Sequence, residues 1–175
     1  SEQQYRGGWG WERGFMMSAD ASFSANLSGA AQSYGQGGSM ARFTMMSEHL
    51  YAVDDKSLRV FDVKNPASTE HLKNIDLGWG IETIFPFQEK LFIGFNSGIH
   101  IYDAQTPSAP TVMSVYQHIT ACDPVVVNEK YAFVTLRNGR TCQNGGNELQ
   151  VVDIRDLYNP RLMMAYPMLN PHGLA

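Results

Sequence analysis

Short apolar runs separated by turn residues fill the chain from Ser39 onward. β-branched and aromatic residues make up runs of four to six, and Gly, Asn, Asp and Pro bound them, which is typical of strands. The clearest runs are 50–53, 58–63, 91–94, 99–103, 131–135 and 149–154. No segment sustains a period of 3.6 residues, which disfavours repeats built from helices.

The runs form an internal repeat. Asp62, Asp103 and Asp153 follow the second run of each pair and are spaced 41 and 50 residues apart. Each pair is preceded by another run and, after an Asn-Pro or Thr-Pro turn, followed by a fourth: these are 42–46, 82–86 and 123–127, then 72–75, 111–115 and 162–166. Four short strands in 40 to 50 residues predict a β-propeller blade. We expect the three aspartates to accept hydrogen bonds from the turns that follow them.

The predicted fold is therefore all-β, a β-propeller with about three four-stranded blades. The blades span 39–77, 78–116 and 117–169, and a further blade starts at 170–175. Residues 1–38 are rich in Gly, Ser and aromatic side chains, and we predict a loop or linker there. Closed propellers typically have roughly four to eight blades, so we expect a fragment of a larger ring and a natural protein that is longer at both ends.

Composition narrows the function. The formal net charge is −4 and the pI is about 5.7, which argues against a general nucleic-acid binder. No apolar run approaches the roughly 18 residues of a membrane-spanning helix. The chain begins at Ser1 without a basic and apolar leader, and we expect a mature or trimmed form.

The repeated pattern Leu/Ile-x-Val/Ile-aromatic-Asp, followed by Asn-Pro, resembles the LVIVD-repeat family of β-propeller proteins. Four phrases are similar to an exported branch of that family in Gram-negative bacteria: GGSMARF at 37–43, GWGIETI at 78–84, CDPVVV at 122–127 and NPHGL at 170–174. The resemblance covers about residues 37–175. It implies a location in the periplasm or on the outer-membrane surface, with a lipid anchor outside this segment. It implies no reaction, because the family has no agreed activity.

The two cysteines predict a disulfide. Cys122 precedes the first strand of the third unit, and Cys142 lies in the longer loop of that unit, 136–148. In a blade that runs up, down, up and down, both positions lie at the same end, so a bridge is feasible. It would also indicate an oxidising compartment. A two-cysteine metal site and a catalytic cysteine are weaker alternatives, since no CxxC pair is present.

Four ionisable residues occupy one equivalent position at the start of the first strands. They are Arg42, Glu82, Asp123 and His172. The first strand of a blade is innermost, so these side chains should ring one mouth of the central channel. We favour a structural network in which Arg42 pairs with Glu82 or Asp123. A ligand or metal site and a catalytic acid–base arrangement remain open.

Trp79 and His118 precede two of these positions and could cover the mouth, but we favour packing between blades for both side chains. Arg137 and Arg140, in the long loop of the third unit, belong to the same end. We identify no catalytic residue, no metal ligand set and no cofactor motif: a phosphate-binding glycine loop, G-x-S-x-G and HExxH are all missing from the sequence.

The predicted function is a non-catalytic binding or scaffold module in an exported cell-envelope assembly at the outer membrane. Its expected partners are other envelope proteins and the rest of its own propeller. The alternative is a hydrolase or lyase, or a ligand- or metal-binding protein, with its site at the polar ring. Propellers support either reading, because sites are grafted onto their loop-built faces.

Overall fold

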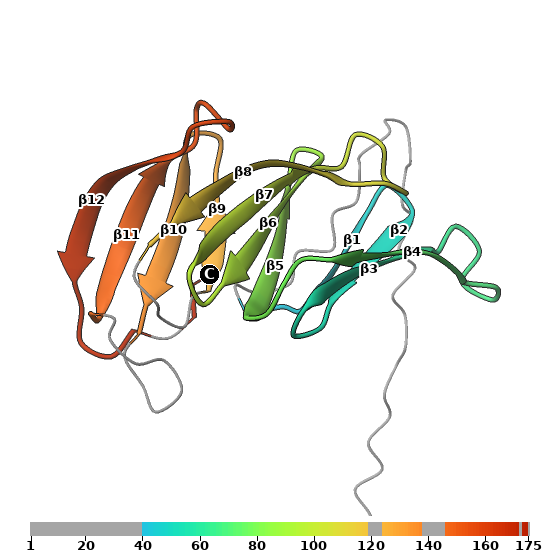
Figure 1. The fold of residues 1–175 in the computed structure, drawn as a ribbon, viewed down its shortest axis with the longest axis horizontal. Coiled ribbons are helices and arrows are strands. Elements are labelled where there is room, and N and C mark those ends of the chain that lie inside the picture. The colour runs from blue at the N-terminus through green and yellow to red at the C-terminus, as the bar shows by residue number, and fades with distance from the viewer. Residues whose placement is uncertain (1–39, 119–123, 138–145, 172, 175) are drawn as a thin grey trace, which may run out of the picture. The chain divides into compact units, whose positions relative to one another are not determined.

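The structure of the chain is a computed structural model that describes residues 40–118, 124–137, 146–171, 173 and 174 (Figure 1). All of them lie in one compact unit, Ala31–Ala175. They form twelve strands in three four-stranded antiparallel sheets. Within the described ranges no segment is a helix, so none could cross a membrane as one. The predicted linker 1–38 and the predicted disulfide Cys122–Cys142 lie outside the described residues.

Each sheet is one blade whose strands pair with their neighbours in chain order. Blade 1 contains β1 (Phe43–Met46), β2 (His49–Val53), β3 (Ser57–Asp62) and β4 (Glu70–Asp76). Blade 2 contains β5 (Ile81–Phe87), β6 (Lys90–Phe95), β7 (Gly98–Asp103) and β8 (Thr111–Gln117). Blade 3 contains β9 (Val125–Val127), β10 (Tyr131–Leu136), β11 (Glu148–Asp153) and β12 (Arg161–Pro167).

The same main-chain contacts recur in all three blades. The residue after the third strand donates its N–H to the carbonyl in the first hairpin, at 2.9 Å each time: Val63 to Glu48, Ala104 to Glu89 and Ile154 to Lys130. The aspartates at the ends of the third strands accept backbone N–H groups two residues on, as predicted: Asp62 from Lys64, Asp103 from Gln105 and Asp153 from Arg155. Each blade therefore repeats one main-chain hydrogen bond and one aspartate-capped turn at the same positions.

Two apolar cores lie between neighbouring blades. One joins residues of blades 1 and 2, such as Tyr51 and Ile93, and the other joins blades 2 and 3, with Phe92 and Val134 among its members. The first strands are adjacent, since β1 contacts β5 and β5 contacts β9. This is the arrangement of consecutive propeller blades, so the predicted all-β propeller fold is confirmed.

The outward faces of the first and third blades carry apolar residues at positions whose equivalents in blade 2 are buried against a neighbouring blade. Ile84 of blade 2 is 1% exposed against blade 1, whereas Phe43, its equivalent 41 residues earlier, is 63% exposed. On blade 3, Phe133, Val151 and Met164 lie in one cross-strand row, and the side chain of Met164 is 49% exposed. Both faces resemble blade-packing surfaces in their residue content.

Candidate functional site

The first strands of the three blades begin at the same end of the unit, which we call the mouth end. A cavity of about 260 Å³ lies there. Segments preceding or opening the first strands line it, together with the residues after β10 and β12: Met40, Glu82, Thr83, Pro124, Arg137, Pro171 and Gly173. All three blades thus contribute to one concave site at the end where the sequence predicts the channel mouth.

Of the four residues predicted to ring the mouth, Glu82 lines this cavity directly. It is half-buried on β5, next to the buried Thr83. Asp123 and His172 lie outside the described residues. Their neighbours in the chain, Pro124 and the pair Pro171 and Gly173, do line the cavity.

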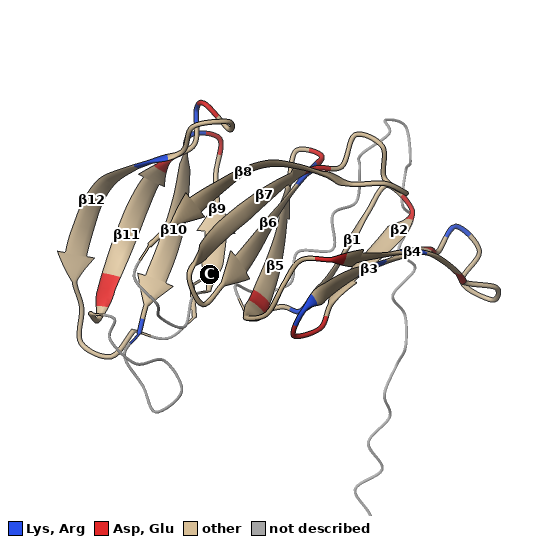
Figure 2. Ribbon diagram, viewed as in Figure 1, with Lys and Arg blue, Asp and Glu red and all other residues tan. Residues whose placement is uncertain are grey.

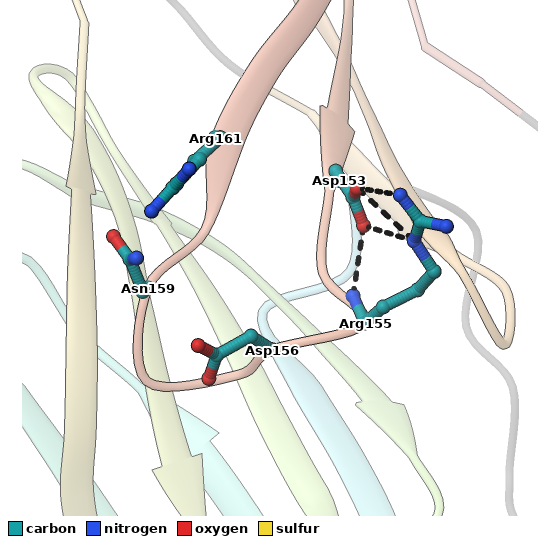
Figure 3. Close-up of a pocket in the computed structure, with 5 residues that line it drawn as sticks. All are labelled: Asp153, Arg155, Asp156, Asn159 and Arg161. Atoms are coloured by element: carbon teal, nitrogen blue, oxygen red, sulfur yellow. Dashed lines mark hydrogen bonds and ion pairs between the residues drawn. The ribbon is translucent and has the colours of Figure 1, made fainter.

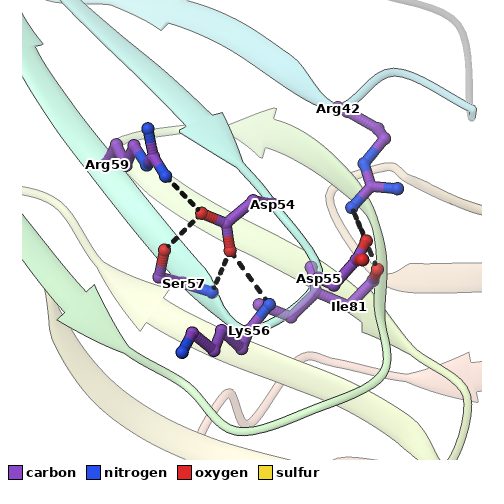
Figure 4. A network of polar contacts seen from close by, with 7 residues as sticks. All are labelled: Arg42, Asp54, Asp55, Lys56, Ser57, Arg59 and Ile81. Carbon is purple, nitrogen blue, oxygen red and sulfur yellow. Dashed lines mark hydrogen bonds and ion pairs between the residues drawn. The ribbon is translucent and has the colours of Figure 1, made fainter.

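Arg42 lies beside the cavity's lining segments and pairs within its own blade. Its Nη2 donates to Asp55 Oδ1 at 2.9 Å and reaches the Ile81 carbonyl at 3.5 Å (Figure 4). Asp55 belongs to the turn between β2 and β3, and its own carbonyl accepts the N–H groups of Gly80 and Ile81. This turn therefore ties blade 1 to the start of blade 2.

Asp54, the neighbour of Asp55, organises the same turn. Its carboxylate accepts the N–H groups of Lys56 and Ser57, the Ser57 hydroxyl and the Arg59 guanidinium, at 2.7 to 3.0 Å. The hydrogen bond from the Lys56 N–H, followed by that from Ser57, holds the pKa of Asp54 far below its usual range. The Asp54 carboxylate thus stabilises the turn, while Asp55, whose side chain is 75% exposed, faces solvent.

Trp79 lies on the segment that connects β4 to β5. The Leu77 N–H donates to the Lys56 carbonyl at 2.8 Å, and the Gly80 N–H to the Asp55 carbonyl at 3.0 Å. Trp79 is 77% exposed between these anchors, and the Lys56 ammonium lies 5.7 Å from its ring centroid. It therefore does not pack between blades.

His118 occupies the equivalent connection between blades 2 and 3. Its N–H donates to the Ser97 carbonyl at 3.1 Å, as Leu77 does to Lys56, and its half-buried ring lies 6.1 Å from that of Tyr116. Both contacts are with residues of blade 2, and Tyr116 itself packs against the core between blades 2 and 3.

The residue pattern did not single out Asp55 and Lys56, which lie in the turn between the second and third strands of blade 1. A signal was present, because the turn between strands two and three lies at the same end as the start of strand one. Charged side chains gather mainly in these turns and loops at the two ends of the blades, while the strands between them are mostly uncharged (Figure 2). In the described part of the chain, no group of three or more His, Cys, Asp or Glu is placed to hold a metal ion.

A second cavity, of about 410 Å³, lies at the opposite end of blade 3, in the loop between β11 and β12 (Figure 3). Asp153 and Arg155 form a bidentate ion pair there, and the Arg155 guanidinium lowers the pKa of Asp153 to about 2. Arg161 lies beside Asn159 across the loop. Because one loop and the strand ends beside it supply the whole lining, this cavity is a weaker candidate than the one at the mouth end.

Comparison with solved structures gives distant similarity only. The N-terminal domain of Nup159 aligns with a TM-score of 0.46 and 10% identity, over 72% of this chain and 30% of that one. Nup159 in a complex of S. cerevisiae Dbp5, Gle1, IP6 and ADP aligns with a TM-score of 0.43 and 10% identity, over 70% and 29%. No curated protein matches the chain.

The family comparison addresses the repeat itself. The LVIVD repeat family matches residues 120–167, a range that contains the four strands of blade 3. The match falls on the unit whose strand sequence Leu149–Asp153 carries the Leu-x-Val-Val-Asp pattern. Residues 120–167 are therefore an LVIVD repeat, and the resemblance of this chain to the LVIVD-repeat family is confirmed there.

Proposed function

We propose that this chain is the propeller part of a non-catalytic binding or scaffold protein in a cell-envelope assembly, and that it binds its partner at the mouth end. The observation that carries the proposal is the cavity to which all three blades contribute. A rigid repeat that converges on one concave site is suited to recognition.

Location and partners belong to the same proposal. The phrases shared with exported LVIVD proteins support export to the periplasm or the outer-membrane surface, with a lipid anchor outside this segment. Other envelope proteins and the rest of its own propeller are the proposed partners. Nucleic acid is not proposed, because the formal net charge is −4.

Site-specific crosslinking in the cell envelope tests the proposal. A photo-crosslinking residue replaces Glu82 in one variant and Tyr158, which is 72% exposed in the β11–β12 loop, in the matched control. We expect a discrete adduct with an envelope protein from position 82 and none from position 158. Adducts of the same protein from both positions, or none from position 82, would contradict binding at the mouth end.

The second candidate is a ligand-binding protein or a hydrolase or lyase that uses the same cavity. It is favoured by the carboxylate of Glu82 and the guanidinium of Arg137, which line one cavity of small-molecule size. A positioned carboxylate can act as a general acid or base. The test is a panel of ester and glycoside substrates. Hydrolysis of any of them by the unsubstituted chain, abolished by Glu82→Gln, would favour this function over a scaffold.

A further inference from the structure

The segment between β4 and β5 holds Trp79 in a defined place. Four main-chain hydrogen bonds fix this segment: Leu77 N–H to Lys56, Gly80 N–H and Ile81 N–H to Asp55, and Asn96 N–H to Gly80. Gly78 and Gly80 have φ values of +85° and +100°, which side chains other than glycine rarely adopt. A Cβ on Gly80 would also lie 2.5 Å from Asn96 Oδ1. The backbone therefore presents Trp79 from a rigid support.

The indole of Trp79 is left largely in water. It is 77% exposed, and the Lys56 ammonium lies over its π-face. No other ring in the described ranges contacts it. A fixed, exposed indole keeps its hydrophobic area for a partner and loses little conformational entropy when that partner binds.

Polar groups of the adjacent turn complete the surface. Asp55 and Arg42 form an ion pair with side chains 75% and 45% exposed, so each keeps hydrogen-bonding capacity toward solvent. Lys56 adds three N–H donors beside the ring. We call the set Trp79, Lys56, Asp55 and Arg42 the Trp79 platform.

The chemistry of the platform selects among ligands. A quaternary ammonium group is disfavoured, because it needs several rings and Lys56 already supplies a cation beside this one. An anion would be attracted mainly by Lys56, because Arg42 is already paired with Asp55. A neutral sugar ring fits, because its C–H face packs on an indole while its hydroxyls both donate to Asp55 and accept from Arg42 and Lys56.

We propose that the Trp79 platform is a saccharide-binding site for neutral, polyhydroxylated glycans. The platform stacks one sugar ring on Trp79 and orients it through the hydroxyl contacts of Asp55 and Arg42. This site goes beyond the proposed protein-binding role and does not use the cavity lined by Glu82.

Calorimetric titration tests the site with maltohexaose, cellohexaose, mannohexaose and xylohexaose as probes and oligothymidylate as a polyanion. We expect at least one hexasaccharide to bind with a Kd below about 1 mM. Trp79→Ala should weaken that binding by about tenfold or more, and Trp79→Phe should weaken it less. Tyr158→Ala, which removes an equally exposed ring from the β11–β12 loop, should leave it unchanged.

Three outcomes would overturn the proposal: no saccharide bound, saccharide binding that Trp79→Ala leaves intact, or Trp79-dependent binding of oligothymidylate instead. Circular dichroism of Trp79→Ala checks that the fold is kept, as its exposure leads us to expect. Crosslinking at Glu82 without saccharide binding would reject this site alone and leave the proposed partner role in place.

Discussion

Adjacent residues in one turn have different tasks, as Asp54 and Asp55 illustrate. Asp54 accepts four hydrogen bonds within the β2–β3 turn, whereas Asp55 faces solvent and pairs with Arg42. The sequence alone does not distinguish the two, since both are acidic residues between two apolar runs. Which of the two faces inward is decided by the backbone angles of the turn, and no residue pattern states those angles.

This difference predicts a pH-dependent effect on stability. Asp54→Ala should lower the free energy of unfolding at pH 7 by about 1 kcal/mol, after allowance for solvent screening of a partly exposed group. The pKa of Asp54 is lowered in the folded state, so its stabilising effect is present above the usual carboxyl pKa and disappears as the pH falls through the folded value. Urea denaturation from pH 7 to pH 2 measures how far the free energy of unfolding of the unsubstituted protein falls toward that of Asp54→Ala.

Asp55→Ala is the matched control at the neighbouring position. Its ion pair with Arg42 is solvent-exposed, and such pairs contribute little, so the change should stay within about 0.5 kcal/mol. A larger loss for Asp55→Ala than for Asp54→Ala would contradict the assignment of roles in this turn.

At the scale of elements, the sequence predicted most of the fold. Runs predicted at 91–94 and 99–103 lie within β6 and β7, because alternating burial and turn residues mark strands of this kind. The fourth strands were harder to delimit. β12 is exposed along its whole length, so no alternation marks its ends, and its pairing with β11 sets them instead.

Gly98 shows why one blade differs from the others at the start of its third strand. It occupies the position of Ser57 and Glu148, yet has φ +156°, and a Cβ there would lie 2.1 Å from the Tyr116 carbonyl oxygen. Its backbone approaches β8 too closely for a side chain.

Gly98→Ala should therefore disrupt the pairing of β7 with β8 and cost about 2 to 4 kcal/mol. Gly146→Ala is the control, because its Cβ would lie 4.0 Å from Glu148 Oε2 without crowding. Thermal unfolding of the two variants should separate them clearly. Equal melting temperatures would mean that β8 moves aside at little cost.

At the scale of the whole molecule, the exposed apolar faces of blades 1 and 3 should determine how the chain associates in water. Phe43 and Met164 are 63% and 49% exposed, on faces whose equivalents in blade 2 are packed against a neighbouring blade. Extended apolar faces of this kind drive association in water. Further blades that complete a ring remain a prediction from the repeat arithmetic.

We expect the 175-residue chain to associate with itself at rising concentration and to bind an apolar fluorescent dye. Phe43→Glu should reduce both, because it places a charge in the middle of an exposed apolar face, and sedimentation velocity measures the change in mass. Tyr158→Glu, in the β11–β12 loop, should change neither. Unaltered association of Phe43→Glu would exclude this face as its cause.

The sequence predicted where the candidate site lies, but not all of the residues that form it. Equivalent positions in the repeat placed Glu82 at the mouth end, and the cavity lies there. The repeat was silent on Asp55 and Lys56, since a residue without counterparts in other blades leaves no periodic signal. Side-chain partners such as Arg42 with Asp55 depend on the three-dimensional path of the β2–β3 turn within its blade, which the repeat pattern does not specify.

The connection between β10 and β11 bears on how such proteins diversify. Two residues join β6 to β7, whereas eleven join β10 to β11, and this difference accounts for the wider spacing of the last repeat. The strands on either side pair in the same order in both blades. The longer loop at the mouth end thus leaves the strand order of its blade unchanged. Library selection could exploit the same tolerance by randomising this loop to obtain new specificities on an unchanged scaffold.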